Sequence, residues 1–283
     1  MDRPTEKDLK ALALLLAAHT DDLQVFASSL AEKMTAAYSD GQNVMRGILI
    51  DAYITLLEDK KPGTYAYMDG IRKLKKVIEE FREEHFESMM DILRSSLEAL
   101  ERNEEKFTLA WIAALYEAFN MASPRTSELS KRTAEEIRKY GVYDGETVDG
   151  IFRKIMDADI QRLSNAVSME AGLKDKGGFA SLKEAIDRAL LTTARQMRIN
   201  VTLVVNGVSN DTSVAITKKN SRFVDAVMWA TELDERVCED CDDLEGEVFL
   251  PEDAPSCPMH PNCRCRLVPV QKEMAEYLKE DEK

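Results

Sequence analysis

The chain has 283 residues, of which 44% are hydrophobic and 32% are charged, and this length allows one large domain or two ordinary ones. Its 52 Asp and Glu residues outnumber its 38 Lys and Arg residues, so the net charge at pH 7 is −14. A surface of this charge repels nucleic acid and anionic membranes, which argues against membrane binding and against sequence-specific binding of nucleic acid.

The N-terminal segment MDRPTEKDLK has mixed charge, and the apolar run 11–18 behind it is too short to span a bilayer. No later apolar run approaches that length. We therefore expect neither a signal peptide nor a membrane helix. The protein is expected in a cytoplasm, where thiols stay reduced and clustered cysteines favour metal binding over disulfides.

The first part of the chain predicts two amphipathic helices. Thr5 and Asp8 form a capping-box pattern that begins a helix over 4–40, whose apolar residues recur at steps of three, four or seven. Gly41 is expected to end this helix. A second helix is predicted over 43–58.

The longest periodic segment covers residues 64–121, with apolar residues mostly three or four positions apart and charged residues between them. It predicts either one very long helix or two helices broken near 102–104. The apolar stripe either packs in an antiparallel bundle within one protomer or docks on a partner protein. His19 and His85 are expected to be an ordinary helix residue and a half-buried packing residue, since an isolated histidine cannot build a metal site.

A break at Ser123-Pro124-Arg125 marks a predicted domain boundary. Helices are predicted beyond it over 128–140 and 147–170, separated by a turn at Tyr143-Asp144-Gly145. The glycines between 172 and 178 are expected to form a flexible joint.

Ser181 and Glu184 form a second capping-box pattern, which opens a helix that is expected to continue to about Val205. Asn206-Gly207 then ends the helix or marks a turn. Beyond this point short runs rich in β-branched and apolar residues predict strands of a small sheet, with Gly246 in a tight turn. These runs are 224–230, 248–249 and 267–270.

All five cysteines of the chain lie within 28 residues, together with one of its three histidines. Cys238-x2-Cys241 and His260-x2-Cys263 share one spacing, and zinc prefers thiolate and imidazole ligands in a tetrahedron. The candidate ligands are Cys238, Cys241, His260, Cys263 and Cys265. We predict a structural Zn²⁺ held by four of them. Free or transiently oxidised thiols, and a catalytic metal with one open position, are the alternatives.

These patterns predict a mainly α protein, in which a long-helix bundle is followed by a small α+β zinc-binding C-terminal module. The predicted domains are an N-terminal helical domain over 1–122, a helical middle segment over 123–178, a C-terminal domain with the metal module over 179–272, and a charged tail over 273–283.

The cysteine-rich stretch resembles a known family. A tryptophan before Asp-Glu-Arg-x-Cys-x2-Cys, then Leu-x-Gly-x-x-Phe and His-Pro-Asn-Cys-Arg-Cys, is similar to the C-terminal domain of the Mu F-like phage minor head (head morphogenesis) proteins. The matching residues are Trp229, Asp234, Cys238, Cys241, Leu244, Gly246, Phe249, His260, Pro261, Asn262, Cys263, Arg264 and Cys265. Cys257 stands where the family usually shows proline, so it is not counted as an inherited ligand, and Gln196 stands where threonine is frequent.

The resemblance covers roughly residues 180–270, and Thr192-Thr193-Ala194-Arg195 falls where the family carries a Thr-x-Ala-Arg helix. It suggests that an arginine such as Arg195 or Arg198 packs this helix against the cysteine-rich module. An ordinary solvated arginine is the alternative.

The resemblance implies a minor head protein of the virion, attached near the portal vertex and needed for head assembly or DNA delivery. Its partners would then be the portal protein and other head or capsid components, with a possible homo-oligomer in the virion and assembly in the host cytoplasm. The sequence shows no phosphate-binding glycine loop and no nucleophile elbow, so no enzymatic activity is expected.

A zinc-dependent nuclease or other hydrolase built on His260 and the cysteines is the alternative function. The number of protein ligands distinguishes the two, because a catalytic zinc keeps a position for water. A zinc-ribbon adaptor for nucleic acid is disfavoured by the charge of −14.

Overall fold

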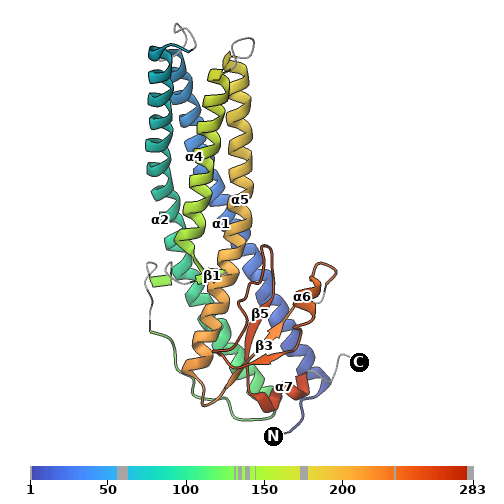
Figure 1. The fold of residues 1–283 in the computed structure, drawn as a ribbon. Helices are drawn as coiled ribbons and strands as arrows, with labels where there is room; N and C mark the ends of the chain where they lie inside the picture. The colour runs from blue at the N-terminus through green and yellow to red at the C-terminus, as the bar shows by residue number, and fades with distance from the viewer. Residues whose placement is uncertain are drawn as a thin grey trace. The chain divides into compact units, whose positions relative to one another are not determined.

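The computed structural model describes residues 2–55, 63–130, 132, 136–137, 141–143, 145–172, 178–232 and 234–278. The helices are α1 (Glu6–Tyr53), α2 (Tyr65–Ala118), α4 (Val148–Gly172), α5 (Gly178–Lys219), α6 (Glu239–Asp242) and α7 (Lys272–Leu278). The strands are β1 (Gly141–Tyr143), β2 (Glu146–Thr147), β3 (Ala226–Ala230), β4 (Val248–Phe249) and β5 (Arg266–Val270). The chain is thus mainly α, with long helices and a small C-terminal sheet, as the sequence predicts (Figure 1).

The fold divides into two compact units, each built from separate stretches of sequence. Unit 1 comprises Met1–Ser29, Arg94–Val148 and Val201–Lys283, and unit 2 comprises Leu30–Leu93 and Asp149–Asn200. The helices α1, α2 and α5 each contribute residues to both units. The four consecutive domains predicted from the sequence, over 1–122, 123–178, 179–272 and 273–283, stay a prediction.

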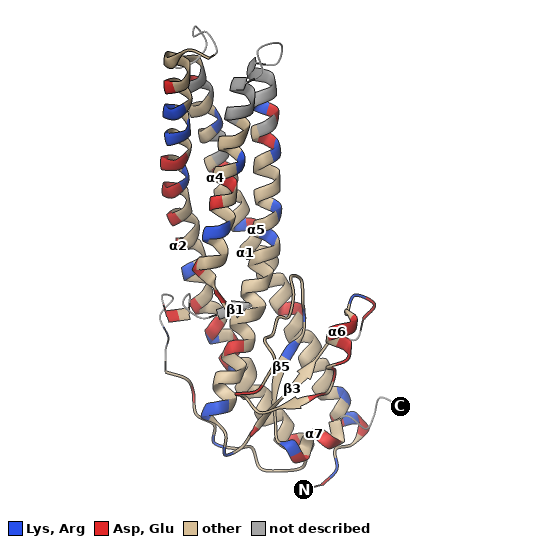
Figure 2. Ribbon diagram, in the orientation of Figure 1, with Lys and Arg blue, Asp and Glu red and all other residues tan. Residues whose placement is uncertain are grey.

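Unit 2 is a bundle of helical segments from α1, α2, α4 and α5. Inside it the fully buried Arg82 and Asp159 form an ion pair at 2.8 Å, and the Tyr38 hydroxyl donates to Asp159 at 2.8 Å. Burial raises the pKa of Tyr38, which keeps this hydroxyl a hydrogen-bond donor. Outside the core, acidic and basic residues are interspersed along the helices (Figure 2).

The predicted long stripe forms a single helix, α2, without a break near 102–104. Its apolar residues are buried within the chain's own two units, as the zero exposure of Ile78, Leu97 and Leu115 illustrates. Of the two roles predicted for the stripe, packing within one protomer is therefore correct.

Helix α1 begins where the capping box predicts. The Thr5 N–H donates to Asp8 Oδ2 at 2.9 Å, and the Asp8 N–H donates to Thr5 Oγ1 at 3.3 Å. The bonds from Thr5 also lower the pKa of Asp8. This reciprocal pair satisfies donors that the first helical turn leaves unpaired, which fixes the start of α1 at Glu6.

Gly41 does not end the first helix, and that prediction is wrong. Helix α1 runs through Gly41 to Tyr53, so the two predicted helices are one. The reason lies on α2: a Cβ placed on Gly41 would come within 1.6 Å of His85 Nε2. Glycine serves here as a point of close approach, and His85, half-buried and stacked on Phe81 with ring centroids 4.4 Å apart, has the predicted packing role.

We expect Gly41→Ala to destabilise the protein by about 1–3 kcal/mol, because the added methyl group must displace the His85 ring. Gly47→Ala, on the same helix, is the matched control, since a Cβ there meets nothing within 4 Å. That change should instead stabilise by about 0.5–1 kcal/mol through helix propensity. Thermal unfolding followed by circular dichroism measures both. Equal stabilisation by the two variants would show that α1 and α2 are not in close contact at Gly41.

Helix α5 differs from the prediction at both ends. It begins at Gly178, which puts Ser181 inside the helix and not at its cap. It also continues through Asn206-Gly207 to Lys219. Asn206 remains helical because its side chain has a tertiary partner: Nδ2 donates to the Cys263 carbonyl at 2.6 Å.

The helix predicted over 128–140 lies largely outside the described residues, and residues 128–130 carry no regular secondary structure. The turn predicted before Thr147 lies between β1 and β2, which pair antiparallel, with Gly145 at φ 71°. The next predicted helix is α4. Among the helices that the structure describes, none combines the length and apolar character needed to cross a membrane.

Unit 1 contains the predicted small sheet, whose antiparallel strands are ordered β4-β3-β5. Side chains alternate between its two faces. Ala226, Met228 and Ala230 contact the apolar cluster built on α1, α2 and α7. Val227 and Trp229 contact the cysteines instead. The sheet therefore separates a helical core from a cysteine cluster.

Candidate metal centre

The cysteines gather on the sheet face that points away from α1 and α2. The buried members of this cluster are Val227, Trp229, Cys241, Cys257, Cys263, Cys265 and Leu267. Cys238 is half-buried beside them. Thiols collected on one buried face are expected either for a metal site or for inert core cysteines, and their geometry distinguishes the two.

Two tight turns present the donor atoms. In the first, which includes α6, the Cys241 N–H donates to the Cys238 carbonyl at 3.1 Å. In the second, the Cys263 N–H donates to the His260 carbonyl, also at 3.1 Å. Asn262 has φ 65°, a left-handed conformation that asparagine adopts more readily than most residues. Each turn thus brings two potential ligands, three positions apart, to the same side of the backbone.

The donors of the two turns face one another. His260 Nε2 lies 3.1 Å from Cys238 Sγ and 3.3 Å from Cys241 Sγ, and Cys241 Sγ lies 3.9 Å from Cys263 Sγ. Cys265 completes a second triad, with Cys241 and Cys263, whose donor atoms all lie within 4.8 Å of one another. Cys241 therefore belongs to both groups of donors that could hold a metal ion.

These distances fit a tetrahedral zinc ion. With Zn–S bonds of about 2.3 Å and a Zn–N bond of about 2.0–2.1 Å, ligand atoms lie roughly 3.5–3.8 Å apart. The observed separations of 3.1–3.9 Å lie close to this range. The two turns together supply three thiols and one imidazole, which is a donor set typical of structural zinc.

The imidazole is oriented for this role. His260 Nδ1 lies 3.0 Å from the Pro261 carbonyl, so Nδ1–H donates there and Nε2 is left facing the thiols. The bond to Pro261 also raises the pKa of His260. A backbone carbonyl that fixes the tautomer in this way is the usual partner of a metal-binding histidine.

The thiols cannot all ionise together without a cation. Burial raises the pKa of Cys241 to about 12, and hydrogen bonds from Cys257 and Cys265 lower the pKa of Cys263 to about 2. The Cys263 thiolate is thus favoured at the expense of the Cys241 thiol, whereas hydrogen bonds from Cys241 outweigh burial and lower the pKa of Cys238. A divalent cation removes this competition, because it stabilises several thiolates at once.

Cys257 occupies a separate place. Its thiol donates to the Cys265 carbonyl at 3.2 Å and accepts an N–H from Asn210 at 3.2 Å. It belongs to neither triad of candidate ligands. Burial raises its pKa well above the usual value, as expected for a core thiol.

A polar row on α5 holds the cysteine segment in place, which the sequence patterns do not predict. Asn206, Asn210 and Ser213 stand three or four positions apart on one side of the helix. The Asn210 amide donates to the Cys265 carbonyl at 3.2 Å and accepts the Leu267 N–H at 2.8 Å, and Ser213 donates to the Leu267 carbonyl at 2.6 Å. These polar residues stand at helical spacing in the sequence. The helix predicted here ends near residue 205, however, so Asn210 and Ser213 lie outside it.

Alternation along residues 263–266 sends cysteines and arginines to opposite sides. Arg264 pairs with Asp234 at 2.5 Å, which holds the pKa of this carboxyl below its usual range. Arg266 pairs with Glu104 on α2 at 2.6 Å. The thiols of Cys263 and Cys265, which precede Arg264 and Arg266, point to the donor cluster. One short segment therefore contributes both to the candidate metal centre and to a buried ion pair.

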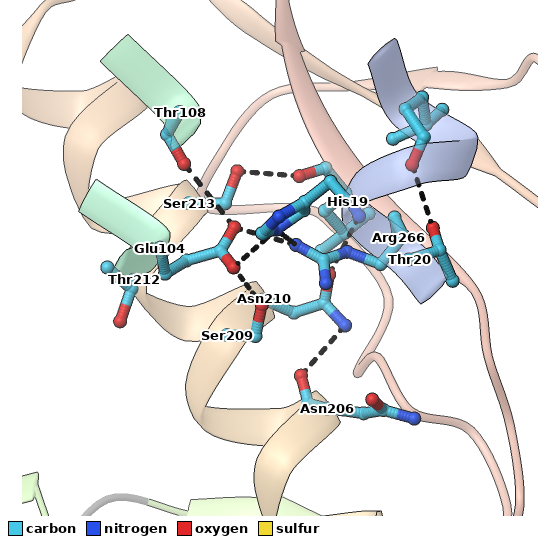
Figure 3. A network of polar contacts seen from close by, with 12 residues as sticks. His19, Thr20, Glu104, Thr108, Asn206, Ser209, Asn210, Thr212, Ser213 and Arg266 are labelled. Carbon is cyan, nitrogen blue, oxygen red and sulfur yellow. Dashed lines mark hydrogen bonds and ion pairs between the residues drawn. The ribbon is translucent and has the colours of Figure 1, made fainter. Parts of the chain in front are cut away.

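Glu104 lies at the centre of a buried polar network (Figure 3). Its carboxylate accepts bonds from Arg266 at 2.6 Å and Ser209 at 2.5 Å, and it lies 2.9 Å from His19 Nε2. Burial alone would raise the pKa of Glu104, but Arg266, His19 and Ser209 outweigh it and lower the pKa to about 2. His19 also stacks on Phe107, with ring centroids 3.5 Å apart, so it has a structural role in this network that the sequence did not reveal.

Arg195 and Arg198 are exposed on α5. Asn206, Asn210 and Ser213 of the polar row make the contacts of α5 with the cysteine segment that are described above.

Residues 140–268 match the model of a protein family described as Phage Mu protein F like protein. The matched region includes α4, α5 and all five candidate ligands, so it confirms the family resemblance drawn from the cysteine motifs. Neither the curated proteins nor the solved structures gave a match.

Proposed function

From the match of residues 140–268 to the phage Mu protein F like family, we propose that the chain acts in phage head morphogenesis. Within that role we assign it as a minor head protein at the portal vertex, active in head assembly or in DNA delivery. The portal protein and other head components are its proposed partners, with more than one copy of the chain in the virion. It is assembled in the host cytoplasm.

The donor set supports a structural role over a hydrolytic one. Cys238, Cys241, His260 and Cys263 supply four ligands, with Cys265 as the alternative fourth. Four protein ligands fill a zinc tetrahedron, whereas a hydrolytic zinc keeps one position for water. We therefore propose a structural Zn²⁺ and a protein without enzymatic activity.

The contacts around the cluster indicate what such an ion stabilises. The two turns are far apart in sequence, and the segment after Cys263 continues directly into β5, at the side of β3. Bound zinc cross-links the turns and thereby fixes the start of β5 over α5. The result is a rigid end to the family region, which suits a protein that must hold its shape in an assembled particle.

The proposal is tested on purified virions of the phage that encodes the chain. Quantitative mass spectrometry should find the chain at fewer copies than the major capsid protein, and cross-linking should join it to the portal protein. Particles made without the chain should be defective in head assembly or in infection, and the wild-type gene supplied in trans should restore them. A chain absent from both virions and head precursors would contradict the proposal.

A further inference from the structure

The two tryptophans of the chain, Trp111 and Trp229, are both buried, but their indole N–H groups differ. Trp111 Nε1 donates to the Pro269 carbonyl at 2.8 Å. Trp229 Nε1 has no hydrogen-bond partner among the residues that the structure describes, although the side chain has no exposed area. Buried donors are nearly always paired, because leaving one without an acceptor is unfavourable. The surroundings of Trp229 should therefore contain what its N–H binds.

Thiols lie around the Trp229 side chain. The ring belongs to the buried cluster that also contains Cys241, Cys263 and Cys265. In the register of the sheet Trp229 is opposite Leu267, and Cys265 stands two positions before Leu267, on the same side of that segment. The other members of the cluster have apolar side chains. Sulfur atoms are thus the side-chain acceptors that this cluster offers to the indole N–H.

The strength of such an acceptor depends on the charge of the sulfur. A neutral thiol is a weak acceptor, whereas a thiolate accepts a charge-assisted hydrogen bond of about twice the usual strength. A metal ion keeps its cysteine ligands in the thiolate form. Groups that donate to ligand atoms or orient them are a regular part of metal sites. A buried N–H without a partner, beside thiols that could hold a metal ion, has the properties of such a group.

We propose that Trp229 is a positioning residue of the metal centre, whose indole N–H donates to the sulfur of a metal-bound cysteine. The bond holds the thiolate in place and offsets part of its negative charge, so it strengthens the binding of the ion. The inference rests on the structural Zn²⁺ proposed above. It adds to the site a residue of β3, which is outside the two turns that carry the ligands.

Nuclear magnetic resonance of the full chain loaded with ¹¹³Cd²⁺ tests the proposal. Cadmium takes the thiolate and imidazole ligands of zinc, and its nuclear spin couples to a proton that is hydrogen-bonded to a ligand sulfur. The two indole protons are assigned from nuclear Overhauser effects. The Trp229 proton should show a coupling to ¹¹³Cd, and the Trp111 proton, bonded to the Pro269 carbonyl, is the internal control without one. A loaded chain whose Trp229 proton shows no coupling would overturn the proposal.

Zinc affinity, measured by competition with a chromophoric chelator, gives a second readout. Trp229→Phe keeps a buried aromatic ring but removes the donor, and it should weaken zinc binding by about tenfold or more. Val227→Ala is the matched control, because it removes packing from the same face of β3 without removing a donor. Its affinity should stay close to that of the wild type. Equal weakening by the two changes would mean that Trp229 acts through packing alone.

The outcomes distinguish this inference from the proposed zinc site. A wild-type chain that binds neither ion contradicts the structural Zn²⁺, and the inference with it. A chain that binds zinc with the same affinity after Trp229→Phe overturns the inference alone and leaves the zinc site in place.

Discussion

Replacing Glu104 by glutamine is expected to lower the free energy of unfolding of unit 1 by about 3–5 kcal/mol, because Arg266 is then left buried without a counter-charge. Trp111 and Trp229, the two tryptophans of the chain, both lie in unit 1, so denaturation followed by tryptophan fluorescence reports on this unit. Glu98→Gln is the matched control. That residue forms an exposed pair with Arg102 on the same helix, and its loss should cost at most about 1 kcal/mol.

The same pair predicts a pH dependence with a definite sign. The pKa of Glu104 is lowered from 4.5 to about 2 in the folded protein, so its ionised form stabilises the fold above pH 4.5. This contribution is lost as the pH falls from about 4.5 to about 2. The difference in stability between the wild type and Glu104→Gln should therefore shrink across this window. A difference that stays constant from pH 7 to pH 3 would show that the charge of Glu104 does not cause the effect.

A double variant shows whether the loss of stability comes from an unpaired buried charge or from lost packing. Glu104→Leu combined with Arg266→Met removes both partners and leaves neither charge unpaired. Such replacements are often close to neutral, so the double variant should be clearly more stable than Glu104→Gln alone. If it is equally unstable, the loss comes from packing around α2 and not from the unpaired arginine.

Replacing Cys241 by serine is expected to remove the bound metal and to unfold unit 1 beyond the cysteine turns. Cys241 takes part in both donor triads, and metal binding and folding form one equilibrium in small zinc sites. Elemental analysis should fall from about one zinc per chain to almost none. Hydrogen exchange should show lost protection in residues 94–118 and 201–219 of unit 1, while residues 71–93 and 149–170 of unit 2 keep theirs.

Cys257→Ser is the matched control for this experiment. It also replaces a buried thiol by a hydroxyl, but this thiol belongs to neither triad, so the zinc content should be retained. The sequence alone predicts damage limited to the region from Trp229 onward. Loss of protection confined to that region would favour a separable module and contradict the shared core of unit 1. Equal loss of zinc in both variants would mean that the ligands are assigned wrongly.

Local patterns in the sequence predict the elements well where local physics decides them. The Thr5–Asp8 box begins α1, the alternating run before Ala230 is β3, and the stripe over 64–121 is helical from Tyr65 to Ala118, although its pattern left open whether it forms one helix or two. The two x2-spaced pairs bring their donors together. The helices and the strand depend on hydrogen bonds and side-chain periods within a few residues, which a single sequence contains. The two turns meet across 22 positions, and here the shared preference of zinc for thiolate and imidazole ligands supplies the prediction.

The sequence predictions are wrong where a contact with a distant segment determines the local structure. The sequence pattern predicts a helix end at Gly41, but the glycine instead makes room for the His85 ring. It predicts a turn at Asn206-Gly207, but Asn206 donates to the Cys263 carbonyl from within the helix. His19 looks isolated, yet its partner Glu104 is 85 positions away. Glycine and asparagine have the same local preferences in a turn and in a tertiary contact, so propensity cannot tell the two uses apart.

The alternation of side chains after Cys263 also limits which changes in chain length unit 1 can tolerate. One residue added or removed between Cys263 and Val268 would turn every following side chain to the other face of the sheet. Arginine would then enter the thiol cluster, and cysteine would meet the helical core. Residues 250–256 lie in a turn and an irregular loop outside the sheet, where side chains do not alternate between two faces. Insertions and deletions among related chains should therefore fall between Phe249 and Cys257, or come in pairs that restore the frame of the strand.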